Sequence, residues 1–195
     1  MKKFIFTLFL TLAISCKPTQ VEIPDELESD SQVSEEDRRD WLTWEECSQL
    51  PGEHPCNFEL SNQNGDSVEL YDHYGKVIIV DLSAMWCGIC RVIAPVGEQI
   101  VADYGSDNVV WLTLLVEDAS GSPPDINDLK EWVSTYGLTS DVLAADRSIL
   151  DPNGITGYPV SGWPTIVVIN REMVVHNGVT GWSESLVRSW VQELL

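Results

Sequence analysis

Two cysteines, Cys87 and Cys90, are separated by Gly88 and Ile89 and follow an apolar run that ends at Leu82. A Cys-x-x-Cys motif between a buried strand and the start of a helix is typical of a dithiol that cycles with a disulfide. Unpaired backbone N–H groups and the helix dipole of the first turn stabilise a thiolate at Cys87. Cys90 lies on the same face, so it can attack a mixed disulfide formed at Cys87. The spacing therefore predicts redox chemistry, with Cys87 as the attacking thiol and Cys90 as the resolving thiol.

A structural zinc site is the other use of such a pair, and it would need two further ligands. The remaining candidates, namely Cys47, Cys56, His54, His73 and His176, contain no second Cys-x-x-Cys. We therefore expect no metal and no organic cofactor.

Asp81 is an acid inside the apolar run 77–82, six residues before Cys87. Burial in a strand raises the pKa of a carboxyl group, which suits Asp81 to proton exchange with Cys90. A hydrogen-bonded structural Asp at the end of a strand is the alternative.

Hydrophobic patterns predict the elements that position these groups. Continuous apolar runs over 77–82 and 109–116 are typical of strands buried on both faces. Apolar residues recur at helical spacing after Gly88 and after Asp125. The predicted order is a hairpin (57–60 and 67–70), a strand (77–82), a helix (88–104), a strand (109–116), a helix (126–136), a short strand (142–145), a hairpin (165–170 and 173–176) and a helix capped by Ser183. This order predicts an α/β three-layer sandwich with a central mixed β-sheet flanked by helices.

The composition limits the partners of the protein. The chain of 195 residues is 44% hydrophobic and 22% charged, as expected for a globular protein. Its 31 acidic residues against 11 Lys and Arg give a formal net charge of −20. A surface this acidic repels phosphate backbones, so we expect no nucleic-acid partner.

The N-terminus has the pattern of an export signal. Met1-Lys2-Lys3 is basic, residues 4–14 are mostly apolar, and Ser15 precedes Cys16. The run is too short to span a bilayer as a helix and is typical of a secretory signal. The context of Cys16 resembles the bacterial lipobox, whose Cys carries the lipid anchor, although Ala13 stands where Leu is usual. An ordinary signal peptide with an incidental Cys16 is the alternative.

The residue composition divides the rest of the chain into a tether and a folded domain. Residues 17–46 hold eleven acidic and three basic residues and few apolar ones, a composition that cannot bury a core. We predict a lipoprotein-type signal peptide over 1–15, an acidic disordered tether over 16–46 and one folded domain over 47–195.

The stretch from Val80 to Pro95, which contains Trp86-Cys87-Gly88-Ile89-Cys90, resembles the active-site segment of thioredoxins. The preceding hairpin and the long segment between Val116 and Val160 resemble the TlpA/ResA-like, AhpC/TSA redoxin branch of that superfamily. The resemblance covers residues 55–195. It implies a thioredoxin-like fold with an N-terminal hairpin and a central helical insertion. Most of these relatives have Pro in place of Ile89, so their reduction potential does not carry over.

The resemblance also implies roles outside the motif. The segment from Val160 to Thr165 resembles the cis-proline loop, in which Pro164 offers backbone groups to a substrate strand. A trans proline that opens a strand is the alternative. Trp163 and Trp86 would shape the substrate groove, and the proton-exchanging acid of the family falls at Asp81.

Cys47 and Cys56 flank a turn-rich stretch that contains Pro51-Gly52 and Pro55. In an oxidising compartment we expect a structural disulfide between them. A second redox pair that relays electrons to Cys87 and Cys90, or two free thiols, are the alternatives.

Together these features predict a membrane-tethered thiol–disulfide oxidoreductase of the bacterial cell envelope, facing the periplasm or the cell surface. We expect a monomer that exchanges disulfides with exported proteins, in the reducing direction because no His between the cysteines stabilises a thiolate strongly. The resemblance implies recycling by a membrane electron donor. A thiol peroxidase is one alternative, although Ala84 stands where peroxiredoxins place Thr or Ser. A non-enzymatic thioredoxin-like binding protein is the other.

Overall fold

The computed structural model describes residues 39–195. The chain divides into two units, Met1–Thr43 and Trp44–Leu195. The predicted signal peptide, Cys16 and the predicted tether as far as residue 38 lie outside the described residues. In the part of the first unit that is described, the Leu42 N–H donates to the Arg39 carbonyl at 2.9 Å. Among residues 39–195, no helix is both long enough and apolar enough to cross a bilayer.

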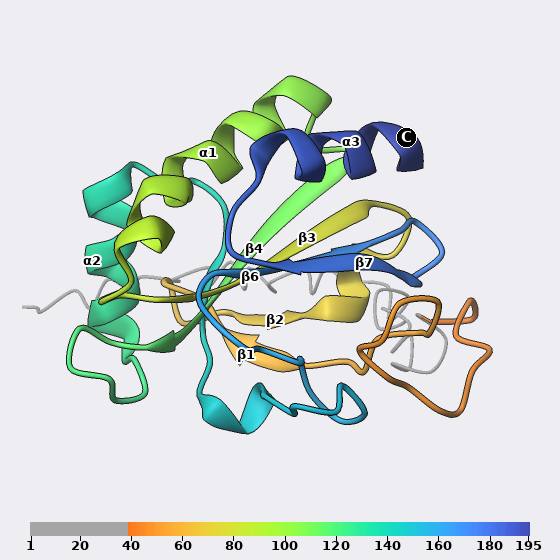
Figure 1. The fold of residues 1–195 in the computed structure, drawn as a ribbon, viewed down its shortest axis with the longest axis horizontal. Helices are drawn as coiled ribbons and strands as arrows, with labels where there is room; N and C mark the ends of the chain where they lie inside the picture. Colours follow the sequence, from red (N-terminus) through yellow and green to blue (C-terminus); the bar gives the residue numbers. More distant parts are fainter. Residues whose placement is uncertain (1–38) are drawn as a thin grey trace, which may run out of the picture. The chain divides into compact units, whose positions relative to one another are not determined.

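The second unit is organised around a five-stranded sheet in the order β5-β4-β3-β6-β7 (Figure 1). Its strands are β3 (Val77–Ala84), β4 (Val109–Glu117), β5 (Val142–Ala144), β6 (Thr165–Ile169) and β7 (Val175–Thr180). β3 runs parallel to β4 and antiparallel to β6, so the sheet is mixed. A separate antiparallel hairpin, β1 (Glu59–Ser61) and β2 (Ser67–Glu69), precedes it. The predicted α/β thioredoxin-like architecture with an N-terminal hairpin is confirmed.

Three helices cover the sheet: α1 (Gly88–Tyr104), α2 (Ile126–Tyr136) and α3 (Glu184–Leu194). α1 and α3 lie side by side over one face, and the hairpin β1–β2 lies on the opposite side (Figure 1). Residues of β3, β4 and β6 pack with Ile93 and Ile100 of α1 and with Val187 and Val191 of α3 in one apolar cluster. Two short 3-10 helices, η2 (Leu70–His73) and η3 (Arg147–Ile149), complete the unit.

β3 is the centre of this core. All eight of its residues are buried, as the continuous apolar run predicts. The helix that follows it begins at Gly88 and ends at Tyr104, with the bounds that its hydrophobic pattern predicts. β3 therefore lies in the middle of the sheet, and its last residue leads through a short turn to the start of α1.

The last hairpin differs from its predicted bounds. The sequence pattern placed its second strand at 173–176, but the strand is β7, Val175–Thr180. The Asn170 side chain accepts N–H groups from Glu172 at 3.1 Å and Val174 at 2.8 Å, and these bonds make the residues before β7 a turn. Ser183 occupies the N-cap position of α3 as predicted, but its side chain makes no capping hydrogen bond.

A tight contact between α1 and the sheet yields a prediction for stability. A Cβ atom at Gly97 would lie 2.7 Å from the indole ring of Trp111, which is fully buried. Gly97→Ala should lower the free energy of unfolding by about 1–2 kcal/mol, because overpacking outweighs the gain in helix propensity. Urea denaturation measures this. Gly88→Ala is the matched control, since a Cβ there meets nothing within 4 Å; equal stability of both variants would contradict the steric reading.

Candidate active site

Cys87 and Cys90 form a disulfide at the start of α1, with their Cα atoms 5.3 Å apart. Cys87 is the N-cap residue, and its sulfur accepts the N–H of Cys90 at 3.2 Å. The Cys87 N–H donates to the Ala84 carbonyl at the end of β3, which fixes the turn between strand and helix. Cys90 is completely buried, whereas Cys87 is 5% exposed. Only one of the two sulfur-bearing residues therefore has any exposure to solvent.

Asp81 lies in β3 on the sheet face that carries α1, because it alternates with Val77 and Ile79, which pack against that helix. Its side chain is fully buried. The Ser83 hydroxyl donates to one carboxyl oxygen at 2.6 Å, and the Thr113 hydroxyl donates to the other at 3.4 Å. Burial raises the pKa of Asp81 to about 7, while these hydrogen bonds oppose the rise. The group can therefore gain and lose a proton near neutral pH.

A second buried carboxyl group, Glu117 at the end of β4, holds the residue before Cys87. Its side chain accepts the indole N–H of Trp86 at 2.7 Å and pairs with the guanidinium group of Arg147 in η3. Its backbone carbonyl accepts the N–H of Met85 at 2.9 Å. Trp86 is thereby fixed beside the disulfide while 45% of it stays exposed.

Sequence reasoning missed the Glu117 contacts. The only signal was a single acid directly after the buried run 109–116, which also fits an ordinary strand end. Its partners lie 31 residues before it and 30 residues after it, so no local pattern connects them.

The loop before β6 contains a cis peptide bond between Trp163 and Pro164. Trp163 packs against the apolar cluster that contains both Cys87 and Cys90. Thr165, the first residue of β6, pairs with Leu82 of β3 in the sheet. The structure thus brings the predicted loop to the end of the sheet at which the disulfide lies.

Cys47 and Cys56 are joined by a second disulfide, with a Cα–Cα distance of 4.8 Å. The segment 47–56 hydrogen-bonds to the beginning of β7, through Gly52 N–H to Val175 O at 2.8 Å and Val175 N–H to Glu53 O at 2.9 Å. It also contacts the loop 150–160, through Gln49 N–H to Gly154 O at 2.7 Å. This disulfide belongs to a loop that covers the sheet edge, away from the turn between β3 and α1.

Metal binding has no support in the described part of the chain. Within residues 39–195, no group of three or more His, Cys, Asp or Glu side chains is placed to hold a metal ion.

The buried acid predicts a pH dependence of stability. Unfolded, Asp81 ionises near 3.8, whereas in the folded protein its pKa is about 7. Between these values the native state holds one more proton, so the free energy of unfolding falls as pH rises from about 4 to 7, by roughly 4 kcal/mol at most. The side chain of the Asp81→Asn variant cannot ionise, so its free energy of unfolding should not show this decrease. The variant should therefore be more stable than the parent at pH 8. Urea midpoints of the oxidised proteins at several pH values measure it, with the exposed Asp66→Asn as control; parallel profiles for the parent and Asp81→Asn would contradict it.

The curated proteins that the chain resembles include a ResA protein and a thioredoxin. It is 26% identical to the thiol-disulfide oxidoreductase ResA of Halalkalibacterium halodurans over 72% of this chain and 75% of that protein. It is 42% identical to the thioredoxin of Coprinus comatus, but over 29% of this chain and 54% of that protein. The chain therefore spans about half the length of the thioredoxin that it matches.

A solved structure shares both fold and sequence with the chain. The exposed lipoprotein thioredoxin Etrx1 of Streptococcus pneumoniae is 28% identical, with a TM-score of 0.57 over 71% of this chain and all of that chain. ResA is named as a thiol-disulfide oxidoreductase, in agreement with the Cys87–Cys90 disulfide at the start of α1. The family model for AhpC/TSA proteins matches residues 51–177, well over half of the sequence, and this chain belongs to the AhpC/TSA family as a thioredoxin-like thiol–disulfide oxidoreductase of the ResA type.

Proposed function

We propose that this protein reduces disulfides of exported proteins outside the cytoplasm while anchored to a membrane through Cys16. The observation that carries the proposal is the burial of Asp81 beneath the helix that begins with the Cys87–Cys90 pair. A dithiol at a helix start supplies two electrons, and a buried carboxyl group with a pKa of about 7 supplies the proton exchange that this chemistry needs.

The reaction begins with the reduced pair. The Cys87 thiolate attacks one sulfur of a client disulfide, forming a mixed disulfide and releasing the other client sulfur as a thiolate that takes up a proton. Backbone N–H groups of the first helical turn, such as the Cys90 N–H that reaches the Cys87 sulfur, stabilise negative charge on Cys87.

The second step forms the Cys87–Cys90 disulfide and releases the client. Asp81 takes the proton of the Cys90 thiol, and the Cys90 thiolate attacks the Cys87 sulfur of the mixed disulfide. The client sulfur leaves as a thiolate and is protonated, so the client gains two electrons and two protons. The product is the Cys87–Cys90 disulfide, the oxidised form of the protein. A membrane electron donor then returns it to the dithiol.

Three residues around the pair form the docking site of the client. The backbone next to Pro164 pairs with an extended client strand, as a β-edge does. Trp163 and Trp86 form the walls beside the sulfurs, and the hydrogen bond of Trp86 to Glu117 holds its ring in place. The client thus presents its disulfide to Cys87 in a defined orientation.

The cellular location rests on the sequence before the described residues. The basic and apolar start, followed by Ser15-Cys16, has the pattern of a lipoprotein signal. The similarity to an exposed lipoprotein thioredoxin supports the same location for this chain. In such a compartment the Cys47–Cys56 disulfide is a stable cross-link of the loop that covers the sheet edge.

A thiol peroxidase is the competing function within this family. Peroxiredoxins are expected to use a hydroxyl side chain three residues before the reactive cysteine, and here that residue is Ala84, fully buried at the end of β3. A methyl group cannot donate a hydrogen bond to a peroxide. Insulin reduction together with peroxide consumption separates the two functions.

The order of attack predicts a trapping pattern. Cys90→Ser should leave clients bound to Cys87 as stable mixed disulfides, because the resolving thiol is gone. Cys87→Ser should trap none, because Cys90 is completely buried. Non-reducing gels of the tagged variants, expressed in their compartment, measure this. A reversed pattern, or a client bound to Cys47 or Cys56, would refute the mechanism.

The membrane anchor predicts a change in location. Cys16→Ala should move the protein from the membrane fraction to the soluble fraction, or block its processing, since no acyl chain can be attached. Fractionation and immunoblotting measure this, with Ser15→Ala as the matched control. A Cys16→Ala protein that is processed and stays with the membrane would rule out the anchor.

A further inference from the structure

Glu117, the last residue of β4, has a side chain that is almost out of reach of solvent. This side chain is 5% exposed, whereas that of its partner Arg147 in η3 is 69% exposed. The Arg147 guanidinium group contacts one carboxyl oxygen, Oε1, through two of its nitrogens. The Trp86 indole N–H donates to the other oxygen, Oε2, at 2.7 Å. Both oxygens are therefore engaged, each by a partner from a different segment of the chain.

The backbone that carries Arg147 is attached to β4. The η3 helix begins after Asp146, whose side chain accepts the Ser148 N–H at 2.6 Å. Just before it, the Ala145 N–H donates to the Leu115 carbonyl of β4 at 2.9 Å. The guanidinium group and the carboxyl group that it contacts are thus carried by segments that are hydrogen-bonded to each other.

The other partner of Glu117, Trp86, is a fixed ring at the surface. It directly precedes Cys87, and 45% of it stays exposed although its indole N–H is hydrogen-bonded. Met85 is held as well, because its N–H donates to the Glu117 carbonyl at 2.9 Å and its carbonyl accepts the Nε–H of Arg91 at 2.7 Å. Fixing an exposed side chain costs conformational entropy in the free protein. A molecule that binds to the ring then has less of this entropy to remove.

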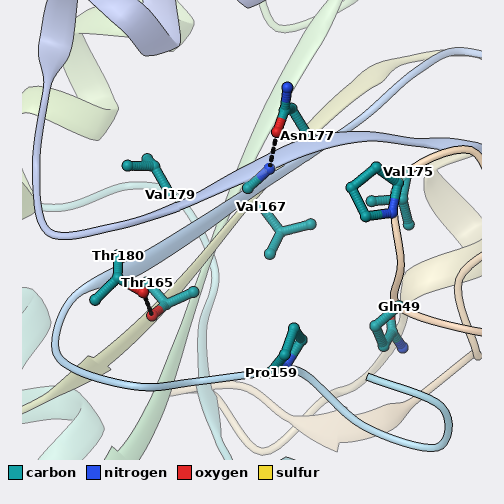
Figure 2. Close-up of a pocket in the computed structure, with 10 residues that line it drawn as sticks. Gln49, Pro159, Thr165, Val167, Val175, Asn177, Val179 and Thr180 are labelled. Atoms are coloured by element: carbon teal, nitrogen blue, oxygen red, sulfur yellow. Dashed lines mark hydrogen bonds between the residues drawn. The ribbon is translucent and has the colours of Figure 1, made fainter. Parts of the chain in front are cut away.

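The second part of the proposed docking site, the loop that contains Pro164, is held without charged groups. Thr165, the next residue, donates to the Gly162 carbonyl at 2.9 Å, and its hydroxyl oxygen lies 3.4 Å from that of Thr180 in β7 (Figure 2). Thr165 and Thr180 line a cavity of about 160 Å³ whose lining contains no Asp, Glu, Lys or Arg. Loss of the ion pair at the end of β4 therefore leaves the hydrogen bonds of this loop in place.

Resting on the proposed binding of clients against Trp86, we infer that Arg147 is a positioning residue for the client. Arg147 orients the Glu117 carboxyl group, Glu117 fixes the Trp86 ring, and the ring meets the client beside Cys87. Without the guanidinium group, the Glu117 side chain turns toward solvent, because an unpaired charge is costly in a position this buried. The indole N–H then loses its acceptor, and each client that binds must order the ring anew.

The test follows the oxidation of the reduced protein by insulin, with acid quenching and chromatography of the two protein forms. The Cys87–Cys90 dithiol passes two electrons and two protons to one insulin disulfide, which becomes two thiols, while the pair becomes the disulfide. The insulin concentration that gives half of the maximal rate reports client binding, and the maximal rate reports the chemical steps. Hydroxyethyl disulfide is the small substrate for comparison, since it carries no segment that could lie against Trp86.

Arg147→Leu should raise the half-saturating insulin concentration about fivefold, which corresponds to the cost of ordering one side chain on binding. The maximal rate and the reaction with hydroxyethyl disulfide should stay within about twofold of the parent, because the dithiol itself is unchanged. In a Trp86→Phe background, where no N–H has to be held, Arg147→Leu should have no further effect. Arg188→Leu is the matched control: it removes ion pairs with Asp103 and Glu184 and should behave as the parent does.

Nuclear magnetic resonance reports the order of the ring directly. The Trp86 indole signal, assigned by its absence in Trp86→Phe, should show a lower heteronuclear NOE and faster N–H exchange with water in Arg147→Leu. Combining Arg147→Leu with Glu117→Gln should restore both values, because an amide oxygen accepts the indole N–H without carrying a charge. Combining it with Glu117→Leu, which leaves no acceptor, should not. Neither double variant contains the unpaired acid, so this comparison also applies if Arg147→Leu alone does not fold.

The outcomes separate this inference from the proposed function. A parent protein that neither disulfide oxidises would refute the oxidoreductase activity, and a Trp86→Ala variant with parental insulin binding would refute docking at Trp86. Parental insulin binding by Arg147→Leu, equal slowing with both disulfides, or additive effects of Arg147→Leu and Trp86→Phe would overturn the role of Arg147 alone. A Trp86 indole group that is equally ordered in the parent and in Arg147→Leu, or one that stays mobile when Glu117→Gln is added, would overturn it as well.

Discussion

Burying a carboxyl group in the middle of a β-sheet disfavours its ionised form, and the domain keeps Asp81 there with hydrogen bonds from the hydroxyl groups of Ser83 and Thr113. Hydroxyl donors offset part of the cost of desolvation, but burial remains the larger effect, so the pKa of Asp81 rises to about 7. A cation at the same place would lower the pKa and leave a carboxylate that is a poor proton carrier. The proton exchange that we propose for Asp81 therefore depends on its burial beneath α1, where the causes of its pKa shift include no neighbouring cation.

One strand provides this environment and also positions the other groups. β3 pairs with β4 on one side and β6 on the other, and every one of its residues is buried. Asp81 lies within it, the turn to Cys87 follows its last residue, and Thr165, next to Pro164, pairs with its Leu82. Groups that must keep fixed distances are thus attached to one rigid element instead of to separate loops.

The parts of the fold that sequence could predict are those governed by local periodicity. The bounds of α1, the buried character of β3 and the position of the N-terminal hairpin all follow from apolar spacing within short windows. The bounds of β7, the second strand of the last hairpin, could not be predicted in this way. They depend on a turn that the Asn170 side chain stabilises by hydrogen bonds, and a hydrophobic pattern does not reveal such bonds. The same reason applies to Glu117: its contacts with Trp86 and Arg147 depend on how β4, the active-site turn and η3 meet in space.

The two buried carboxyl groups, Asp81 in β3 and Glu117 in β4, show how different surroundings give the same functional group different properties. Asp81 is surrounded by hydroxyl donors, so it can be neutral or charged without breaking an ion pair. Glu117 is bound by a guanidinium group and an indole N–H, so its side chain is fixed by an ion pair and a hydrogen bond. The proton exchange that we propose for Asp81 and the fixing of the Trp86 ring by Glu117 need these opposite environments. Their separation onto neighbouring strands, with different partners, lets one small domain contain both.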